Sequence, residues 1–243
     1  MTQHQRMIYL DDALALPGCP VCRMTLQRVA QTLASIEAEL VLDPTWREQV
    51  DSAWGFCNLH ARQWLDQAQP LSTAIIYEAV LGRITRQLEQ RLPSRAGPGN
   101  VRSRIAGMRS GGAQREVLVA PGVCPLCRTR DEQERQIVVH LLRELKSDVM
   151  RTRYAASDGL CVVHLDLALA TSPEPEVLDA LRTRLVERHE VLRSELRDVI
   201  RTHDYRFREA EAGPQWNAIA GAVRHVAGSP GIDGRRARPD RGD

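Results

Sequence analysis

The sequence predicts an all-α protein made of two homologous helical units, each with a Cys3His metal site, joined by a flexible linker. Aromatic residues make up only 4% of the 243 residues, and the excess of Leu, Ala, Glu and Arg over them favours helices. A pair of cysteine and histidine motifs occurs twice, and apolar residues recur at helical spacing after each motif. The repeated motifs define the two units, and the apolar spacing defines their helices.

The repeat is visible in the cysteine motifs themselves. CPVC, from Cys19 to Cys22, is followed by GFCNLH, which ends at His60. CPLC, from Cys124 to Cys127, is followed by GLCVVH, which ends at His164. The second cysteine of each CxxC lies 35 positions before the next cysteine in the first half and 34 in the second. Because all six cysteines obey this register, we interpret the pattern as an internal repeat.

Helices are expected after each motif. Each CxxC leads into an amphipathic helix, marked by Val29, Leu33, Ile36 and Leu40, and by Val138, Leu141, Leu145 and Val149. In the first half, Asp43 and Pro44 have the character of an N-cap and a first-turn proline, and they open a short helix that ends before Gly55. The second half turns instead at Asp158 and Gly159. Long closing helices follow each CxxH, marked by Leu71, Ile75, Val80, Ile84 and Leu88, and by Leu178, Leu181, Leu185, Leu192 and Leu196.

Four segments follow from these patterns. The first helical Cys3His unit covers residues 8–92, and the second, with a C-terminal helix, covers residues 122–228. Residues 93–121 are rich in Arg, Gly and Ser without a sustained hydrophobic period, so we expect a flexible linker there. Residues 229–243 have the composition of a disordered tail.

The motif spacing predicts two metal sites, each formed within its own unit. The first would use Cys19, Cys22, Cys57 and His60, and the second Cys124, Cys127, Cys161 and His164. A CxxC turn aims two sulfurs at one point, and a Cys and His three positions apart on a helix share a face and complete a tetrahedron. Four protein ligands close the site to water and substrate, so we expect two structural zinc ions per chain. Backbone amides at the adjoining helix starts are expected to stabilise the thiolates.

Other interpretations of the cysteines compete with zinc. Three Cys and one His can also hold an iron-sulfur cluster, which remains the alternative cofactor. Buried cysteines without a ligand role do not account for the matching CxxH motifs. A thioredoxin-like redox role requires CxxC at a strand-to-helix junction, and the sequence shows no convincing strand.

Charge and composition leave several functions open. A net charge of +2 implies no nucleic-acid or membrane partner for the whole chain, and no apolar stretch has the length of a signal peptide or a membrane span. We therefore expect a cytoplasmic protein, in which six cysteines favour metal or redox chemistry over disulfides. The favoured function is a non-catalytic zinc-binding module with an unidentified protein partner, because no familiar catalytic motif occurs.

Two other functional classes remain. An iron-sulfur or thiol redox sensor is the first. A nucleic-acid-binding regulator is the second, and its basis is a group of linker arginines: Arg95, Arg102, Arg104, Arg109 and Arg115. An enzyme of unfamiliar type is the less favoured outcome.

The motifs also resemble a known group of proteins. CPVC with GFCNLH, CPLC with GLCVVH, and the later stretch HDYRFREAEAGPQW together resemble an uncharacterised bacterial family. The resemblance spans most of the chain and implies the architecture and the ligand positions. It implies no activity.

Overall fold

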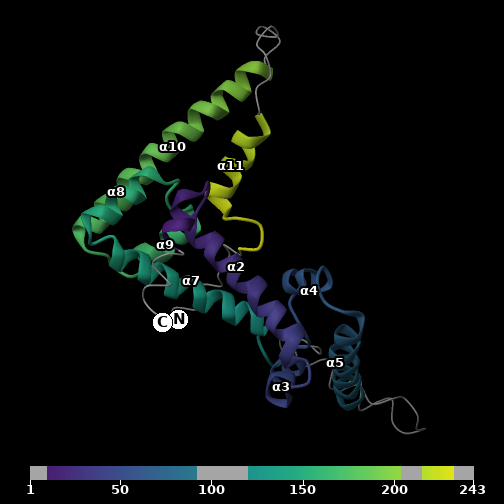
Figure 1. The fold of residues 1–243 in the computed structure, drawn as a ribbon. Coiled ribbons are helices and arrows are strands. Elements are labelled where there is room, and N and C mark those ends of the chain that lie inside the picture. The colour runs from purple at the N-terminus through teal and green to yellow at the C-terminus, as the bar shows by residue number, and fades with distance from the viewer. Residues whose placement is uncertain (1–9, 92–119, 204–214, 233–243) are drawn as a thin grey trace, which may run out of the picture. The chain divides into compact units, whose positions relative to one another are not determined.

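The chain is helical wherever its structure is described. The computed structural model describes residues 10–91, 120–203 and 215–232 (Figure 1). These residues form helices, turns and bends and contain no strand, which confirms the all-α prediction. None of the helices in these ranges has both the length and the apolar character needed to cross a bilayer.

Two compact units make up the fold, and they do not follow the order of the sequence. Unit 1 combines residues 1–30 with residues 129–243, and unit 2 is Gln31–Arg128. The boundaries fall inside α2 (Pro20–Ser35) and α7 (Pro125–Glu144), so each of these helices contributes residues to both units. The units therefore differ from the sequential ranges 8–92 and 122–228. Of the expected linker 93–121, residues 93–119 lie outside the described residues.

Unit 1 builds its core from both ends of the chain. After α7 it contains α8 (Asp148–Ala156), α9 (Val162–Leu169), α10 (Pro175–His203) and α11 (Gln215–Ala227). The long helix α10 packs against α8 and α11 (Figure 1). Leu10, Leu14 and Val21, from the start of the chain, share one buried cluster with Leu141 and Leu181. Burial of these apolar side chains joins the beginning of the sequence to its second half.

Two expectations in unit 1 need correction. Val149 does not continue the helix marked by Val138 and Leu141, because α7 ends at Glu144 and α8 begins at Asp148. Val149 is 63% exposed, so it does not belong to the buried stripe. The expected tail also begins too early, because Ile232 packs into the core of unit 1. Residues 233–243 lie outside the described residues.

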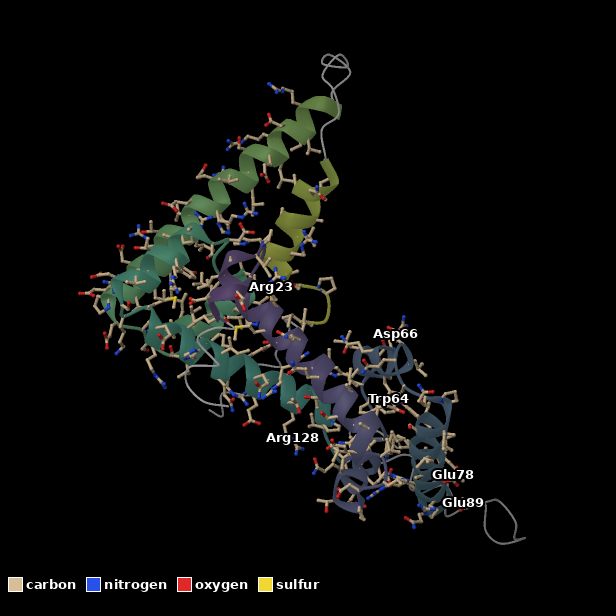
Figure 2. All side chains as sticks on the ribbon, in the orientation of Figure 1. Arg23, Trp64, Asp66, Glu78, Glu89 and Arg128 are labelled. Atoms are coloured by element: carbon tan, nitrogen blue, oxygen red, sulfur yellow. The ribbon has the colours of Figure 1, made fainter. Side chains whose placement is uncertain are left out.

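Unit 2 is organised around aromatic side chains. Helix α2 continues into the π-helix η1 (Ile36–Leu40), and α3 (Pro44–Ser52), α4 (Asn58–Leu65) and α5 (Pro70–Arg91) follow. Phe56 lies between Trp46 and Trp64, with ring centroids 6.3 and 5.4 Å away. Trp64 lies on α4 (Figure 2). Its indole donates a hydrogen bond of 3.0 Å to the Thr73 hydroxyl, which links α4 to α5. These rings pack together around the GFCNLH motif, which contains Phe56.

The start of α3 was predicted from sequence. The Asp43 carboxylate accepts a hydrogen bond of 2.7 Å from the backbone N–H of Trp46, and Pro44 occupies the first turn. This is the N-cap and first-turn proline arrangement expected for that segment. The cap confirms the predicted start of the helix, and α3 ends at Ser52, before Gly55.

Candidate metal centres

The eight predicted ligands gather into two groups of four. Centre 1 consists of Cys19, Cys22, Cys161 and His164, and it lies in unit 1. Centre 2 consists of Cys57, His60, Cys124 and Cys127, and it lies in unit 2. In each group the four candidate ligand atoms all lie within 4.8 Å of one another. Each centre is therefore a Cys3His group, as the motifs predict.

The partners within the centres are exchanged relative to the prediction. Each CxxC meets the CxxH of the opposite half of the sequence, so the grouping of Cys19 and Cys22 with Cys57 and His60 is wrong. The physical reason is the length of the intervening helix. The 16 residues of α2 rise by about 24 Å, which leads the chain away from Cys22 before the GFCNLH motif is reached. The 20 residues of α7 rise by about 30 Å and separate the second CxxC from its own CxxH in the same way.

Each CxxC motif lies at the start of a helix. In CPVC the proline is the first residue of α2, and in CPLC it is the first residue of α7. Proline suits this position because its ring fixes a helical φ and no N–H is needed there. The carbonyls of Cys19 and Cys124 accept the first-turn hydrogen bonds from Arg23 and Arg128, each 3.2 Å long. Both sulfurs of each motif are thus held by the first turn of a helix.

The CxxH motifs also lie at the starts of helices. Cys57 is the N-cap of α4 and Cys161 is the N-cap of α9, each with an extended backbone, and the histidine follows three residues later. Two helix N-termini therefore meet at each centre, and α2 begins beside α9 at centre 1 (Figure 1). Helix N-termini carry partial positive charge and unpaired N–H groups. They stabilise the negative charge that thiolates bring to such a site.

The distances between ligand atoms are those of a small tetrahedron. In centre 1 the Cys22 and Cys161 sulfurs are 3.6 Å apart, and His164 Nδ1 lies 3.3 to 3.5 Å from the three sulfurs. In centre 2 the Cys57 and Cys127 sulfurs are 3.5 Å apart, and His60 Nδ1 lies 3.2 to 3.6 Å from the three sulfurs. A tetrahedron with Zn–S bonds of about 2.3 Å has S–S edges of about 3.8 Å. The clusters match one central ion closely.

The sulfurs of the centres are thiols or thiolates. All six cysteines are free, and the S–S distances far exceed a disulfide bond of about 2.05 Å. In centre 1, hydrogen bonds with Cys161 and Cys19 lower the pKa of Cys22, whereas burial raises the pKa of Cys19. In centre 2, Cys124 and Cys127 lower the pKa of Cys57. The crowded sulfurs thus share protons and negative charge, and like charges so close together repel each other. A bound cation relieves this repulsion.

The sulfurs raise the pKa of both histidines. Burial works to lower the pKa of His164, but Cys161, Cys22 and Glu134 raise it to about 11. Burial likewise opposes the effect of Cys124 and Cys57 at His60, whose pKa rises to about 9. In both rings Nδ1 faces the sulfurs. A metal ion at the centre would bind this nitrogen of the neutral imidazole.

Two contacts at centre 1 were not anticipated from the sequence. The Glu134 carboxylate lies 3.7 Å from Nε2 of His164, on the side of the ring opposite the sulfurs. The backbone N–H of Ser229 lies 3.5 Å from the Cys22 sulfur. Glu134 could have been found as an acid four positions before Val138, in line with the apolar stripe of Val138 and Leu141 on α7. Ser229 could not, because its segment has the composition of a tail.

Comparison with known proteins gives a family and no activity. A family model described as "Family of unknown function (DUF6062)" matches residues 1–231. No curated protein and no solved structure matches the chain.

Proposed function

Because the chain belongs to this family, whose description assigns no function, we propose from the centres themselves that it is a non-catalytic zinc protein. Each of its two Cys3His centres would hold one structural ion, and the helical surface would serve a protein partner. The observation that carries the proposal is the meeting of two helix N-termini around four ligand atoms at tetrahedral distances. Four protein ligands close the metal to water, which suits a structural role better than hydrolysis.

The size of the centres supports a single ion rather than a cluster. Ligand atoms that all lie within 4.8 Å of one another enclose room for one metal ion, whereas a cluster of several iron and sulfide atoms needs more widely spaced sulfurs. Three thiolates and an imidazole are ligands that zinc prefers. Zinc is therefore the proposed ion, and the iron-sulfur alternative is the less favoured one.

The proposed adaptor role, that is, binding of a protein partner, rests on side chains outside the two centres. Unit 2 exposes several leucines by more than 60%, namely Leu42, Leu65, Leu71 and Leu81. These side chains are the contacts that we propose for a protein partner. A pocket of 360 Å³ in unit 1 is lined by ion-paired side chains such as Arg184 and Glu187, so it favours no particular chemistry. The linker arginines behind the nucleic-acid alternative lie outside the described residues.

The proposed location is the cytoplasm. All six cysteines are free, and a reducing compartment keeps thiolates available for metal.

Metal content tests the proposal and the exchanged pairing together. Purified native protein is expected to contain about two zinc ions per chain by elemental analysis. The double variant Cys19→Ser with Cys161→Ser removes two ligands of centre 1 and should retain one ion. The double variant Cys19→Ser with Cys57→Ser damages both centres and should retain neither. Replacement of a soft thiolate by a hydroxyl weakens zinc binding because the remaining ligands hold the ion less tightly.

The sequential pairing makes the opposite forecast. If Cys19 and Cys57 shared a centre, their double variant would keep one ion and the Cys19 and Cys161 double variant would keep none. Native protein without bound metal would refute the proposed function itself. Absorption of protein purified without oxygen identifies the ion, because zinc-thiolate sites are colourless and iron-sulfur clusters are brown.

A further inference from the structure

We propose that the two centres differ in function: centre 1 retains its ion, whereas centre 2 exchanges its ion with thiol ligands and chelators in solution. This inference rests on the proposed function, because both centres must bind metal for their exchange rates to differ. Its basis is a set of contrasts between the two centres in burial and in the contacts behind their ligands.

The first contrast is access to the sulfurs. Every ligand of centre 1 is buried, and Cys22 and Cys161 are each only 1% exposed. In centre 2, His60 and Cys124 are buried, but Cys57 and Cys127 are half-buried. Exchange at a closed tetrahedral site begins when an incoming ligand reaches the ion or displaces a sulfur. Cys57 and Cys127, the two half-buried residues of centre 2, whose sulfurs are 3.5 Å apart, offer that approach.

The second contrast lies behind the histidines. At centre 1 the Glu134 carboxylate, 1% exposed, faces Nε2 of the fully buried His164. Arg130 lies 3.9 Å from the same carboxylate and forms an ion pair with it. A carboxylate on the far nitrogen fixes the orientation of a ligating imidazole and strengthens it as a ligand.

The repeat does not supply a second such acid. Glu134 follows Cys127 by seven positions, and the residue seven positions after Cys22 is Val29. Val29 is buried and apolar, so α2 carries no carboxylate at the matching position. The two halves therefore differ in the carboxylate that faces the histidine of centre 1.

The third contrast is the covering of centre 1 by the end of the described chain. The N–H of Ser229 faces the Cys22 sulfur at 3.5 Å, and Ile232 packs in the core that contains Cys22 and Cys161. A backbone donor lowers the charge density of a thiolate and makes its displacement less favourable. This contact is a further reason to expect slower release of the ion from centre 1.

Kinetics of metal release test the inference on the full-length protein loaded with two zinc ions. With the chromogenic chelator 4-(2-pyridylazo)resorcinol in excess, we expect two phases of about one ion each. Brief treatment of the same protein with N-ethylmaleimide, followed by peptide mass mapping, should modify Cys57 and Cys127 before the cysteines of centre 1. This second measurement needs no variant and does not depend on the folding of one.

The variant Glu134→Gln assigns the slow phase. It should accelerate that phase by about tenfold or more and leave the fast phase unchanged, since loss of an outer carboxylate weakens metal binding by about 10- to 100-fold. Glu132→Gln is the matched control, because Glu132 lies on the same helix but is exposed and receives its hydrogen bond from Gln136. The control should alter neither phase.

Three outcomes would overturn the inference. They are release of both ions in one phase, earlier modification of Cys19, Cys22 or Cys161, and a slow phase unaffected in a folded Glu134→Gln protein. None of these would refute the proposed function, because each assumes a protein with two bound ions. Absence of metal from the native protein would refute both.

Discussion

Two glycines shape the backbone that carries the CxxH motifs. Gly55 and Gly159 each lie two residues before the N-cap cysteine, and their φ angles are +87° and +71°. L-residues rarely adopt this left-handed region, so the glycine of GFC and of GLC has a conformational purpose. A Cβ at Gly159 would also lie 2.9 Å from Cγ of Arg184 and 3.3 Å from the Tyr154 hydroxyl. That hydroxyl accepts the N–H of Leu160, the residue before Cys161.

Replacement of Gly159 by alanine should therefore weaken unit 1. We expect Gly159→Ala to lower the free energy of unfolding by about 1 to 2 kcal/mol, from the left-handed φ alone. Chemical denaturation at fixed zinc concentration measures the change. Gly82→Ala is the control, since Gly82 lies within α5 and its added Cβ would meet only the end of Arg86, at 3.4 Å. The control should be neutral or more stable, and an equally destabilised control would remove the conformational explanation.

At the scale of elements, α11 is attached to α10 through a pair of histidines. The rings of His189 and His225 meet edge to face with centroids 5.0 Å apart, and His225 is buried. Burial lowers the pKa of His225 to about 4, and the electrostatic effects of His189, Arg188 and Arg184 act in the same direction. Asp158 is the group that opposes them. The docked helix thus favours the neutral form of His225.

The lowered pKa predicts an acid-sensitive contact between α10 and α11. Because the folded pKa, about 4, lies below the unfolded value of about 6.5, the unfolded chain binds the proton more readily. Stability should fall as the pH drops from about 6.5 to about 4, and the loss is complete below the folded pKa. The uncharged variant His225→Gln should show a shallower fall across that window when melting temperatures are measured at fixed zinc concentration. Parallel curves for the two proteins would show that His225 does not titrate in this way.

The helices and turns differ in how well the sequence predicted them. The cap at Asp43 and the glycine turns were predictable because they depend on a few neighbouring residues. The break between α7 and α8 was not, since Val149 continues the helical spacing of Leu141 and Leu145 across residues 145–147. The burial of Ile232 was not predicted, because a single apolar residue in a short segment has no sequence pattern. Its burial depends on the tertiary core against which it packs.

The whole molecule is organised by the exchange of motif partners between the halves of the sequence. Residue types and spacing were enough to identify all eight side chains of the two centres. They could not identify the partners, because sequential and exchanged pairings satisfy the same motif geometry. The choice depends on the direction in which α2 and α7 carry the chain, which is a tertiary property. As a result, both centres join a segment before residue 93 to a segment after residue 119.

This topology predicts the behaviour of a cut chain. With a protease site introduced among residues 93–119, cleavage should leave the two fragments in one complex that retains both ions, since each centre takes two ligands from each fragment. The shared core of Leu10, Leu14 and Leu141 adds to the association. Size-exclusion chromatography with metal analysis should therefore show one species, and a chelator should lower the denaturant concentration at which the fragments separate. Sequential centres would instead give two separable fragments with one ion each. That result would refute the exchanged pairing even if the intact protein bound two ions.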